Sequence, residues 1–330
     1  MDECRMRAVE LVKNLSLADA TRCDHRVVFL AEELKACGLI LNAVLLEMRA
    51  TALVANTKKV ASHQILQYQS NMSVIEPSLQ GKLVLITGCT GGIGQATARA
   101  FARHGCSIAV HHSSQKSKAK ADVLVSELMS LAPGVRAAPF EADLSSYENA
   151  RTLHAHVVKG LGHPDILFSN HGVTGPVIGP EGDIGKVSAE VFEEIWRTNT
   201  GTAYLLAQLC VPYMESKKWG RIIFTSSVAA GNGGILGPQY ASSKSALHGL
   251  VHWLSLRYSK DGITANAIAP ALIEDTAMMS NPSDAVRSKI PIGRLGKPDE
   301  IASIVLLLAT NGYMTNKVIV ADGGWTIGGF

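Results

Sequence analysis

The stretch from residue 81 to residue 104 constrains the fold of this chain more than any other part. An apolar run at residues 81–87 leads into a glycine-rich turn at residues 88–94, and a helical pattern follows at residues 95–104. Glycines in such a turn let the backbone and the helix N-terminus approach a pyrophosphate closely. A glycine turn alone is a weak signal, but its place between an apolar strand and an amphipathic helix strengthens it. This order of elements predicts a dinucleotide-binding unit.

The same alternation continues along the chain. Further apolar runs typical of strands occur at residues 107–111, 135–141, 166–169 and 317–321. Amphipathic helical patterns occur at residues 147–161 and 297–309. Strands that alternate with helices predict a parallel sheet covered on both faces, which is an α/β fold of the doubly wound, Rossmann type. We predict a single catalytic domain over residues 81–330.

Residues 1–80 differ in character from the rest of the chain. Leucines recur there at steps of three and four residues, which predicts helices, but no motif points to a role. Two readings stay open for this helical N-terminal extension. It packs on the body or on a partner, or it is dispensable and translation starts internally at Met72.

Composition and charge exclude several classes of protein. The chain of 330 residues is 47% hydrophobic and 18% charged with a net charge of +3, so neither a disordered chain nor a nucleic-acid-binding protein is expected. The six cysteines lack C-x-x-C spacing, which predicts neither a metal site nor a disulfide framework. The apolar run at residues 36–46 is too short to span a bilayer, and no signal peptide precedes it. A cytoplasmic protein with no membrane contact is therefore expected.

Tyr240 and Lys244 form the strongest candidate for chemistry. Residues four apart share one face of a helix, so both side chains point into one cleft if a helix begins near Pro238. An ammonium group held near a phenol favours the phenolate and lowers the pKa of the tyrosine, which suits general acid–base catalysis. An isolated pair of this kind is more often an exposed helical pair. Ser227, thirteen positions before Tyr240, supports the catalytic reading.

The end of the second predicted strand bears on which nucleotide is bound. An NAD site usually carries an acidic residue there for the ribose 2′-hydroxyl, whereas this chain has His112 followed by Ser113 and Ser114. Hydroxyls and the nearby Lys116 and Lys118 suit a 2′-phosphate, and no carboxylate in this segment repels it. NADP is therefore predicted in preference to NAD. In the alternative reading, the two lysines simply begin a solvated helix.

With these motifs in place, the chain from residue 81 to residue 330 resembles the short-chain dehydrogenase/reductase family. The resemblance implies a catalytic tetrad of Asn199, Ser227, Tyr240 and Lys244. It also implies a set of cofactor contacts, namely Thr87, Gly88, Thr90, Gly92, Ile93, Gly94, His112, Ser113, Ser114, Asp143, Leu144, Asn170, Gly172, Tyr240, Lys244, Pro270, Ile273 and Thr276. His171 departs from the Asn-Ala-Gly motif of the family, and we expect this departure to matter little. Thr276 lies one position later than in the commonest pattern.

The resemblance implies an oxidoreductase that interconverts a small-molecule carbonyl and an alcohol by hydride transfer. In that scheme Tyr240 exchanges the proton, Ser227 stabilises the developing oxyanion, Lys244 grips the nicotinamide ribose, and Asn199 holds a water that links the lysine to solvent. The apolar stretch at residues 274–296 lies where the family keeps its substrate lid. A homotetramer or homodimer is also implied.

Three functions remain open at this stage. The preferred one is a broad NADPH-dependent carbonyl reductase. The second is a 3-oxoacyl-acyl-carrier-protein reductase, for which the two basic carrier-binding positions fall at Lys218 and Asp261. One of them is acidic here, which counts against a carrier protein as partner. The third is a non-catalytic sensor or scaffold that binds NADP(H), although both Tyr240 and Lys244 are present.

Overall fold

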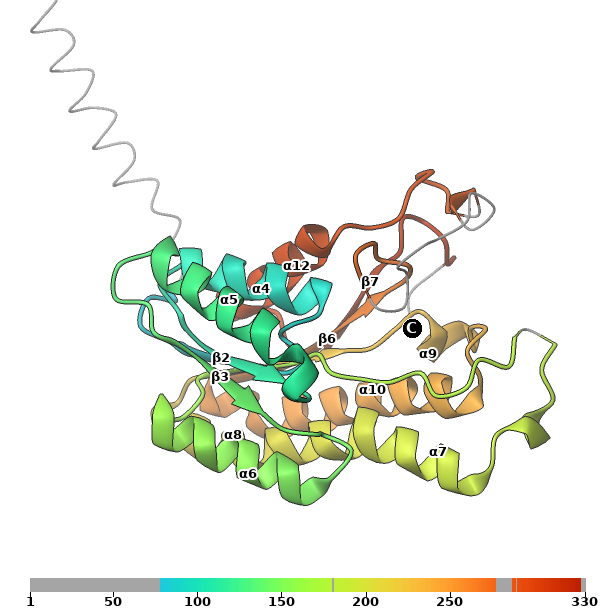
Figure 1. Cartoon of the computed structure of the whole chain (residues 1–330), viewed down its shortest axis with the longest axis horizontal. Helices are drawn as coiled ribbons and strands as arrows, with labels where there is room; N and C mark the ends of the chain where they lie inside the picture. Colours follow the sequence, from blue (N-terminus) through green and yellow to red (C-terminus); the bar gives the residue numbers. More distant parts are fainter. Residues whose placement is uncertain (1–77, 180, 277–286, 289, 328–330) are drawn as a thin grey trace, which may run out of the picture. The chain divides into compact units, whose positions relative to one another are not determined.

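The computed structural model describes residues 78–179, 181–276, 287–288 and 290–327 (Figure 1). The predicted helical extension and the proposed internal start at Met72 lie outside this part of the chain. So do residues 277–286 and 289 of the predicted substrate lid. Within the described ranges, no helix has the length and apolar character needed to cross a membrane.

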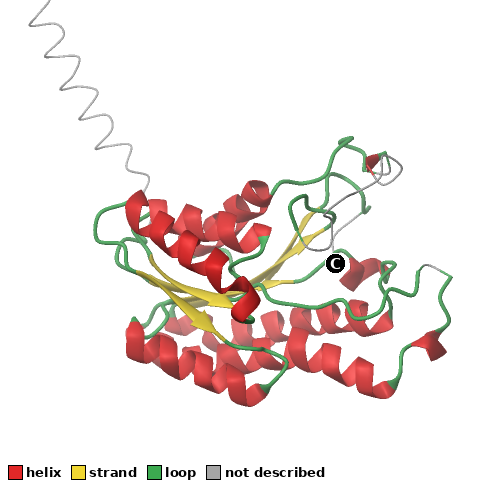
Figure 2. Ribbon diagram, in the orientation of Figure 1, coloured by secondary structure: helices red, strands yellow, loops and turns green. Residues whose placement is uncertain are grey.

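A sheet of seven parallel strands forms the centre of the described residues (Figure 2). Its order is β3-β2-β1-β4-β5-β6-β7, with β1 between β2 and β4. The strands are β1 (Leu83–Ile86), β2 (Ser107–His112), β3 (Ala137–Glu141), β4 (Ile166–Ser169), β5 (Gly220–Thr225), β6 (Ile263–Pro270) and β7 (Lys317–Ala321). Val84 is in register with Ile108 of β2 and with Ile166 of β4. The predicted doubly wound Rossmann-type sheet is confirmed.

Helices cover both faces of this sheet (Figure 1). One face carries α4 (Gly92–Arg103), α5 (Gln115–Leu131) and α12 (Pro298–Thr310). The other carries α6 (Tyr147–Gly160), α8 (Thr202–Lys217) and α10 (Pro238–Tyr258). Two shorter helices are α7 (Ala189–Trp196), which packs against α10, and α9 (Ala229–Asn232).

Alternate residues of each strand enter opposite layers, because successive side chains of a strand point to opposite faces. Val84 and Ile86 pack with α4, α5 and α12, whereas Leu83 and Leu85 pack with α6, α8 and α10. All four side chains are buried. A parallel sheet buried on both faces requires such continuous apolar runs, and this explains why the sequence reveals β1, β2 and β4 clearly. The similarly buried β5 was not predicted.

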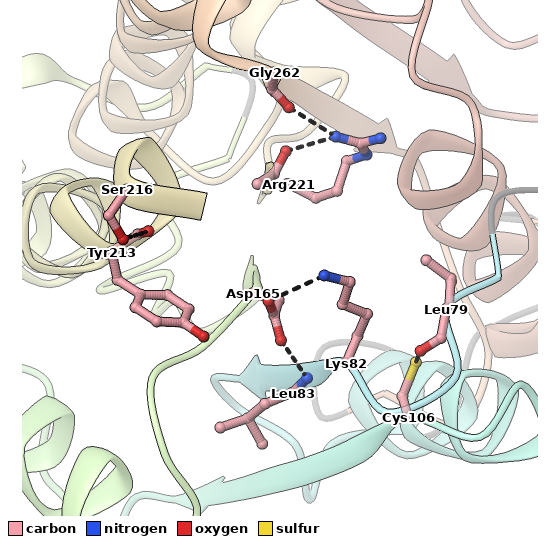
Figure 3. Close-up of polar contacts among 10 residues, drawn as sticks. Leu79, Lys82, Leu83, Cys106, Asp165, Tyr213, Ser216, Arg221 and Gly262 are labelled. Atoms are coloured by element: carbon pink, nitrogen blue, oxygen red, sulfur yellow. Dashed lines mark hydrogen bonds and ion pairs between the residues drawn. The ribbon is translucent and has the colours of Figure 1, made fainter. Parts of the chain in front are cut away.

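Charged residues hold the amino ends of the central strands together (Figure 3). One carboxylate oxygen of Asp165 accepts from the backbone N–H of Leu83 at 2.9 Å, and the other lies 3.3 Å from Lys82 Nζ. The buried guanidinium of Arg221 donates to the carbonyl of Gly262 at 3.2 Å and to that of Ala309, in the last turn of α12, at 2.8 Å. These contacts stabilise the amino edge of the sheet, opposite the carboxyl edge at which the candidate site lies.

Candidate active site

The glycine-rich turn between β1 and α4 is held so tightly that side chains would not fit. Gly88 has φ of +59°, a left-handed conformation that favours glycine. A Cβ atom on Gly94 would lie 2.4 Å from the carbonyl oxygen of Gly88. A Cβ atom on Gly92 would lie 2.4 Å from the carbonyl oxygen of Asp275, which places the segment after β6 against the turn. The turn is therefore a backbone-lined cradle at the N-terminus of a helix.

Asn170, directly after β4, fastens this turn to its neighbours. Its backbone N–H donates to Thr87 Oγ1 at 2.8 Å, and its side-chain nitrogen donates to the carbonyl of Thr87 at 3.3 Å. Its side-chain oxygen accepts from Thr225 Oγ1 at 3.0 Å. One asparagine thus joins the carboxyl ends of β1, β4 and β5.

Tyr240 and Lys244 lie in the first two turns of α10, which begins at Pro238 as predicted. They are 5% and 3% exposed, respectively. Lys244 Nζ donates to the carbonyl of Thr225 at 2.8 Å and lies 5.9 Å from the ring centroid of Tyr240. The Tyr240 hydroxyl is hydrogen-bonded to Ser227. Ser227, Tyr240 and Lys244 are therefore brought together at the carboxyl edge of the sheet.

Asn199 reaches the same place from a π-helical turn (Arg197–Gly201) between α7 and α8. Its side-chain oxygen accepts from the backbone N–H of Val173 at 2.8 Å, and its nitrogen donates to the Val173 carbonyl at 2.9 Å. A Cβ atom on Gly172 would lie 3.0 Å from Lys244 Nζ and 3.1 Å from Asn199 Oδ1. Gly172 therefore allows the lysine and the asparagine to approach one another.

The electrostatics of the pair differ from the sequence-based expectation. Burial raises the pKa of Tyr240 above its usual value, and the hydrogen bond to Ser227 opposes this only in part. Burial lowers the pKa of Lys244 to about 8. The predicted lowering of the tyrosine pKa is wrong for this structure, because the phenol is buried and the ammonium is bonded to the Thr225 carbonyl. The phenol is thus protonated at neutral pH, the form that can donate a proton.

The segment after β2 also requires a correction. His112 was predicted to face a 2′-phosphate, but its side chain is buried, and the residue is only 2% exposed. Its Nδ1 atom lies 3.1 Å from the carbonyl oxygen of Ser114 and 3.9 Å from the Glu141 carboxylate on neighbouring β3. A carboxylate therefore does lie near this edge, contrary to the expectation from the local sequence. Exposed Ser113 and half-buried Ser114 remain at the start of α5.

The two lysines behind them follow the alternative reading. Lys116 and Lys118 lie on the exposed side of α5, and Lys118 Nζ is 2.6 Å from the carboxylate of Asp122. They are surface residues of a solvated helix in this structure. Polar groups that could meet a phosphate at this edge include the exposed Ser113 hydroxyl, the Ser114 hydroxyl, which also caps α5, and the first N–H groups of α5.

The remaining predicted cofactor residues also lie near the carboxyl edge. Asp143 is exposed and Leu144 buried in the loop after β3, and Pro270 is the last residue of β6. Buried Ile273 and half-buried Thr276 follow β6, and Thr276 Oγ1 donates to the Ile273 carbonyl at 2.8 Å. The half-buried residues Thr90 and Ile93 belong to the turn and to α4. Across the described ranges, no three His, Cys, Asp or Glu side chains gather as metal ligands do.

Sequence reasoning missed three buried residues that support this site. His111 Nδ1 accepts from the N–H of Gly88 at 2.9 Å, and its Nε2 donates to the carbonyl of Ala142 at 2.9 Å. His171 and Gln239 are likewise bonded to the backbone around the site. For His171 a signal existed, since it departs from the motif that the chain otherwise matches. The expectation that this departure matters little stays a prediction, and the hydrogen bonds of the His171 ring count against it.

A seven-stranded Rossmann sheet with a glycine cradle, a half-buried serine, and a buried tyrosine and lysine at its carboxyl edge defines the class of nucleotide-binding oxidoreductases. A family model described as Enoyl-(Acyl carrier protein) reductase matches residues 88–326. The chain belongs to the short-chain dehydrogenase/reductase family. The predicted class of enzyme, an oxidoreductase acting on CH–OH and C=O groups, is confirmed at this level.

Relatives in this family are named for different activities. The chain is 32% identical to the 3-oxoacyl-(acyl-carrier-protein) reductase FabG of Thermotoga maritima, over 76% of this chain and 99% of that protein. It is 30% identical to the 7alpha-hydroxysteroid dehydrogenase of Bacteroides fragilis, over 75% and 95%. A solved structure, a blue fluorescent protein from a metagenomic library in complex with NADPH, matches with a TM-score of 0.67 and 29% identity, over 76% of this chain and all of that one.

Proposed function

We propose that this chain is an NADP(H)-dependent oxidoreductase that interconverts a carbonyl and a secondary alcohol, with Tyr240 as the proton donor and acceptor. The observation that carries the proposal is the position of buried Tyr240. It is hydrogen-bonded to Ser227, lies beside Lys244, and stands at the same sheet edge as the glycine cradle. A protonated phenol next to a hydroxyl donor suits a reaction that places negative charge on a carbonyl oxygen.

The cradle fits a dinucleotide. Side chains at Gly88, Gly92 and Gly94 would meet the backbone within 3.3 Å, so the bare backbone is kept open at the N-terminus of α4. Such a helix start attracts a pyrophosphate through its free N–H groups and its dipole. NADPH, when bound, supplies the hydride. The likeness of this chain to a solved structure that holds NADPH supports the choice of this nucleotide.

The side chains of the chain then divide the remaining work. Tyr240 delivers its proton to the carbonyl oxygen as that oxygen gains charge, and Ser227 donates a hydrogen bond to the same oxygen. Lys244, with a pKa of about 8, is largely charged at neutral pH and stabilises the phenolate that remains. Asn199, which like Lys244 lies next to Gly172, binds a water for the return of the proton.

A carrier-protein substrate is the second candidate, because several relatives are named 3-oxoacyl-(acyl-carrier-protein) reductases. In this chain Lys218 Nζ lies 2.7 Å from the carboxylate of Asp261. The aspartate thus offsets the basic charge at the first of the two carrier-binding positions. This pairing favours a free small-molecule carbonyl.

The proposal is tested with the full-length protein and a panel of substrates. NADPH oxidation is followed with cyclic ketones, quinones and 3-oxoacyl thioesters, each thioester both free and attached to an acyl carrier protein. We expect turnover of free carbonyl compounds and no gain from the carrier. A large gain in kcat/KM with the carrier would favour the second candidate. NADPH binding with no turnover of any compound would favour the non-catalytic reading.

A further inference from the structure

The π-helical turn that carries Asn199 leaves one backbone carbonyl without its usual partner. The N–H of Thr202 donates to the carbonyl of Arg197, one residue further back than in an α-helix. In a regular helix that N–H would donate to the carbonyl of Thr198. Buried carbonyls need a donor, and an unsatisfied one costs free energy. Something else must therefore serve Thr198.

The ring of His171 does so from outside the helix. Its Nε2 atom lies 3.0 Å from the carbonyl oxygen of Thr198 and 3.0 Å from Thr202 Oγ1. A carbonyl accepts only, so Nε2 carries the proton and Nδ1 is an acceptor. Burial lowers the pKa of His171 to about 3, so the ring is neutral at physiological pH. The Thr202 hydroxyl lies within hydrogen-bonding distance of the carbonyl oxygens of Thr198 and Leu144. It is the second side chain that replaces the missing helical bond to Thr198.

The other end of the same ring lies on the cofactor turn. His171 Nδ1 is 2.8 Å from Thr87 Oγ1, which also accepts from the backbone N–H groups of Asn170 at 2.8 Å and His171 at 3.2 Å. The threonine hydroxyl therefore donates to Nδ1. The His171 ring thus joins the end of β1 to the π-helical turn. It bonds the carbonyl of Thr198, and Asn199 is the next residue along the chain.

We propose that His171 is a positioning residue that stabilises the π-helical turn and thereby places Asn199 beside Lys244. The proposal deepens the proposed function and rests on it insofar as Asn199 serves the proton return. An alanine at this position, as in the related motif, could make neither hydrogen bond. This chain thus has a hydrogen-bonding ring where the motif has only a methyl group.

Thr87 keeps two backbone donors whatever stands at position 171, so loss of the ring should spare the cofactor turn. The Thr198 carbonyl would lose the ring N–H and keep the Thr202 hydroxyl, whose one proton it shares with the Leu144 carbonyl. Loss of the His171 ring should therefore affect some properties of the protein and spare others. Turnover and the order of the π-helical turn depend on His171, whereas NADPH affinity does not.

The test uses the full chain with three substitutions. His171→Leu removes both hydrogen bonds, His171→Gln keeps an N–H donor at similar reach, and His154→Leu is a matched control on α6, where the ring lies near His163. For His171→Leu we expect kcat to fall roughly tenfold, as for loss of one hydrogen bond, with the Kd for NADPH changed less than about twofold. His171→Gln should recover most of kcat, and His154→Leu should retain wild-type kcat.

A second readout does not depend on activity. Hydrogen exchange followed by mass spectrometry should show faster exchange across residues 197–202 in His171→Leu, and no change there in His154→Leu. Wild-type exchange across these residues in His171→Leu would overturn the inference, as would equal losses in the glutamine and leucine variants. If the wild type reduces no carbonyl, the proposed function fails, while exchange still decides whether His171 holds the turn.

Discussion

The side-chain nitrogen of Gln239 lies 3.0 Å from the carbonyl oxygen of Thr174 and donates to it. The same nitrogen lies 2.9 Å from the carbonyl oxygen of Pro176. Gln239 is fully buried and directly precedes Tyr240, so the loop after β4 is fastened to the first turn of α10. This loop stands beside the reacting groups, and its backbone also bonds Asn199 through Val173.

Removing the Gln239 donors should loosen that loop. Gln239→Met keeps the length of the side chain and leaves the two carbonyls without their donor, at a cost of about 1–3 kcal/mol. We expect the KM for the carbonyl substrate to rise roughly tenfold and hydrogen exchange at residues 173–178 to increase. Gln208→Met, on the exposed side of α8, is the matched control. Unchanged exchange in the loop would show that Gln239 does not hold it.

Removing the Tyr240 hydroxyl should abolish turnover without abolishing nucleotide binding. Tyr240→Phe lacks the proton donor, and general acid–base catalysis contributes about 10²–10⁴-fold in rate. We expect a fall in kcat of that size, measured as NADPH oxidation, with NADPH affinity close to that of the wild type. Tyr313→Phe, at an exposed position, should behave as wild type. An unchanged kcat in Tyr240→Phe would remove the proton-donor role.

The choice of nucleotide should depend on the charge at the end of β2. Ser113 is exposed there, and no acidic residue follows the strand directly. The wild type should prefer NADPH to NADH when kcat/KM is compared. Ser113→Asp adds a carboxylate that repels a 2′-phosphate and suits a 2′-hydroxyl, so this preference should fall by roughly ten- to a hundredfold. Ser126→Asp adds the same charge further along α5 and should leave it unchanged.

Acid should destabilise the protein through the two buried histidines beside the cofactor turn. Burial lowers the pKa of His111 to about 4 and that of His171 to about 3. Below about pH 6.5 the unfolded chain binds protons at these residues that the folded chain does not bind. The free energy of unfolding therefore falls with pH from about 6.5 down to the folded pKa, by on the order of 3–5 kcal/mol for each residue.

Replacing one of these histidines should make that fall less steep. His111→Asn removes the titrating ring but keeps an oxygen that can accept from the N–H of Gly88. Urea unfolding of this variant between pH 7 and pH 4 should show a smaller loss of stability than the wild type. His104→Asn, at an exposed position, is the control. Parallel curves for the wild type and His111→Asn would exclude this origin of acid sensitivity.

Most of the strands and the reacting side chains could be predicted from the sequence because each leaves a local or regularly spaced trace. Strands β1, β2 and β4 read as apolar runs, although β5, which is about as buried, was not predicted. Ser227, Tyr240 and Lys244 have characteristic separations. The helix start near Pro238 was also predicted correctly. These features depend on residues close together in the chain, where periodicity and spacing are informative.

The features that were missed depend on contacts between distant segments. The raised pKa of Tyr240 follows from how completely the fold buries it, which spacing does not reveal. The burial of His112 follows from its pairing with Glu141 across two strands. The π-helical turn around Asn199 is held by residues far from it in the chain: His171 bonds to the Thr198 carbonyl, and Ser243 Oγ accepts from the Asn199 side chain.

Because β1 lies between β2 and β4 in the sheet, folding of the chain is coupled to binding of the nucleotide. The glycine cradle gains its walls only when β4, far along the chain, has docked beside β1, and such long-range closure is slow and entropically costly. A nucleotide that binds the completed sheet alone shifts this equilibrium by mass action, by about 2.7 kcal/mol at a hundredfold excess over its Kd. The supply of nucleotide would then determine how much of the protein survives in its native form, as well as how fast that protein works.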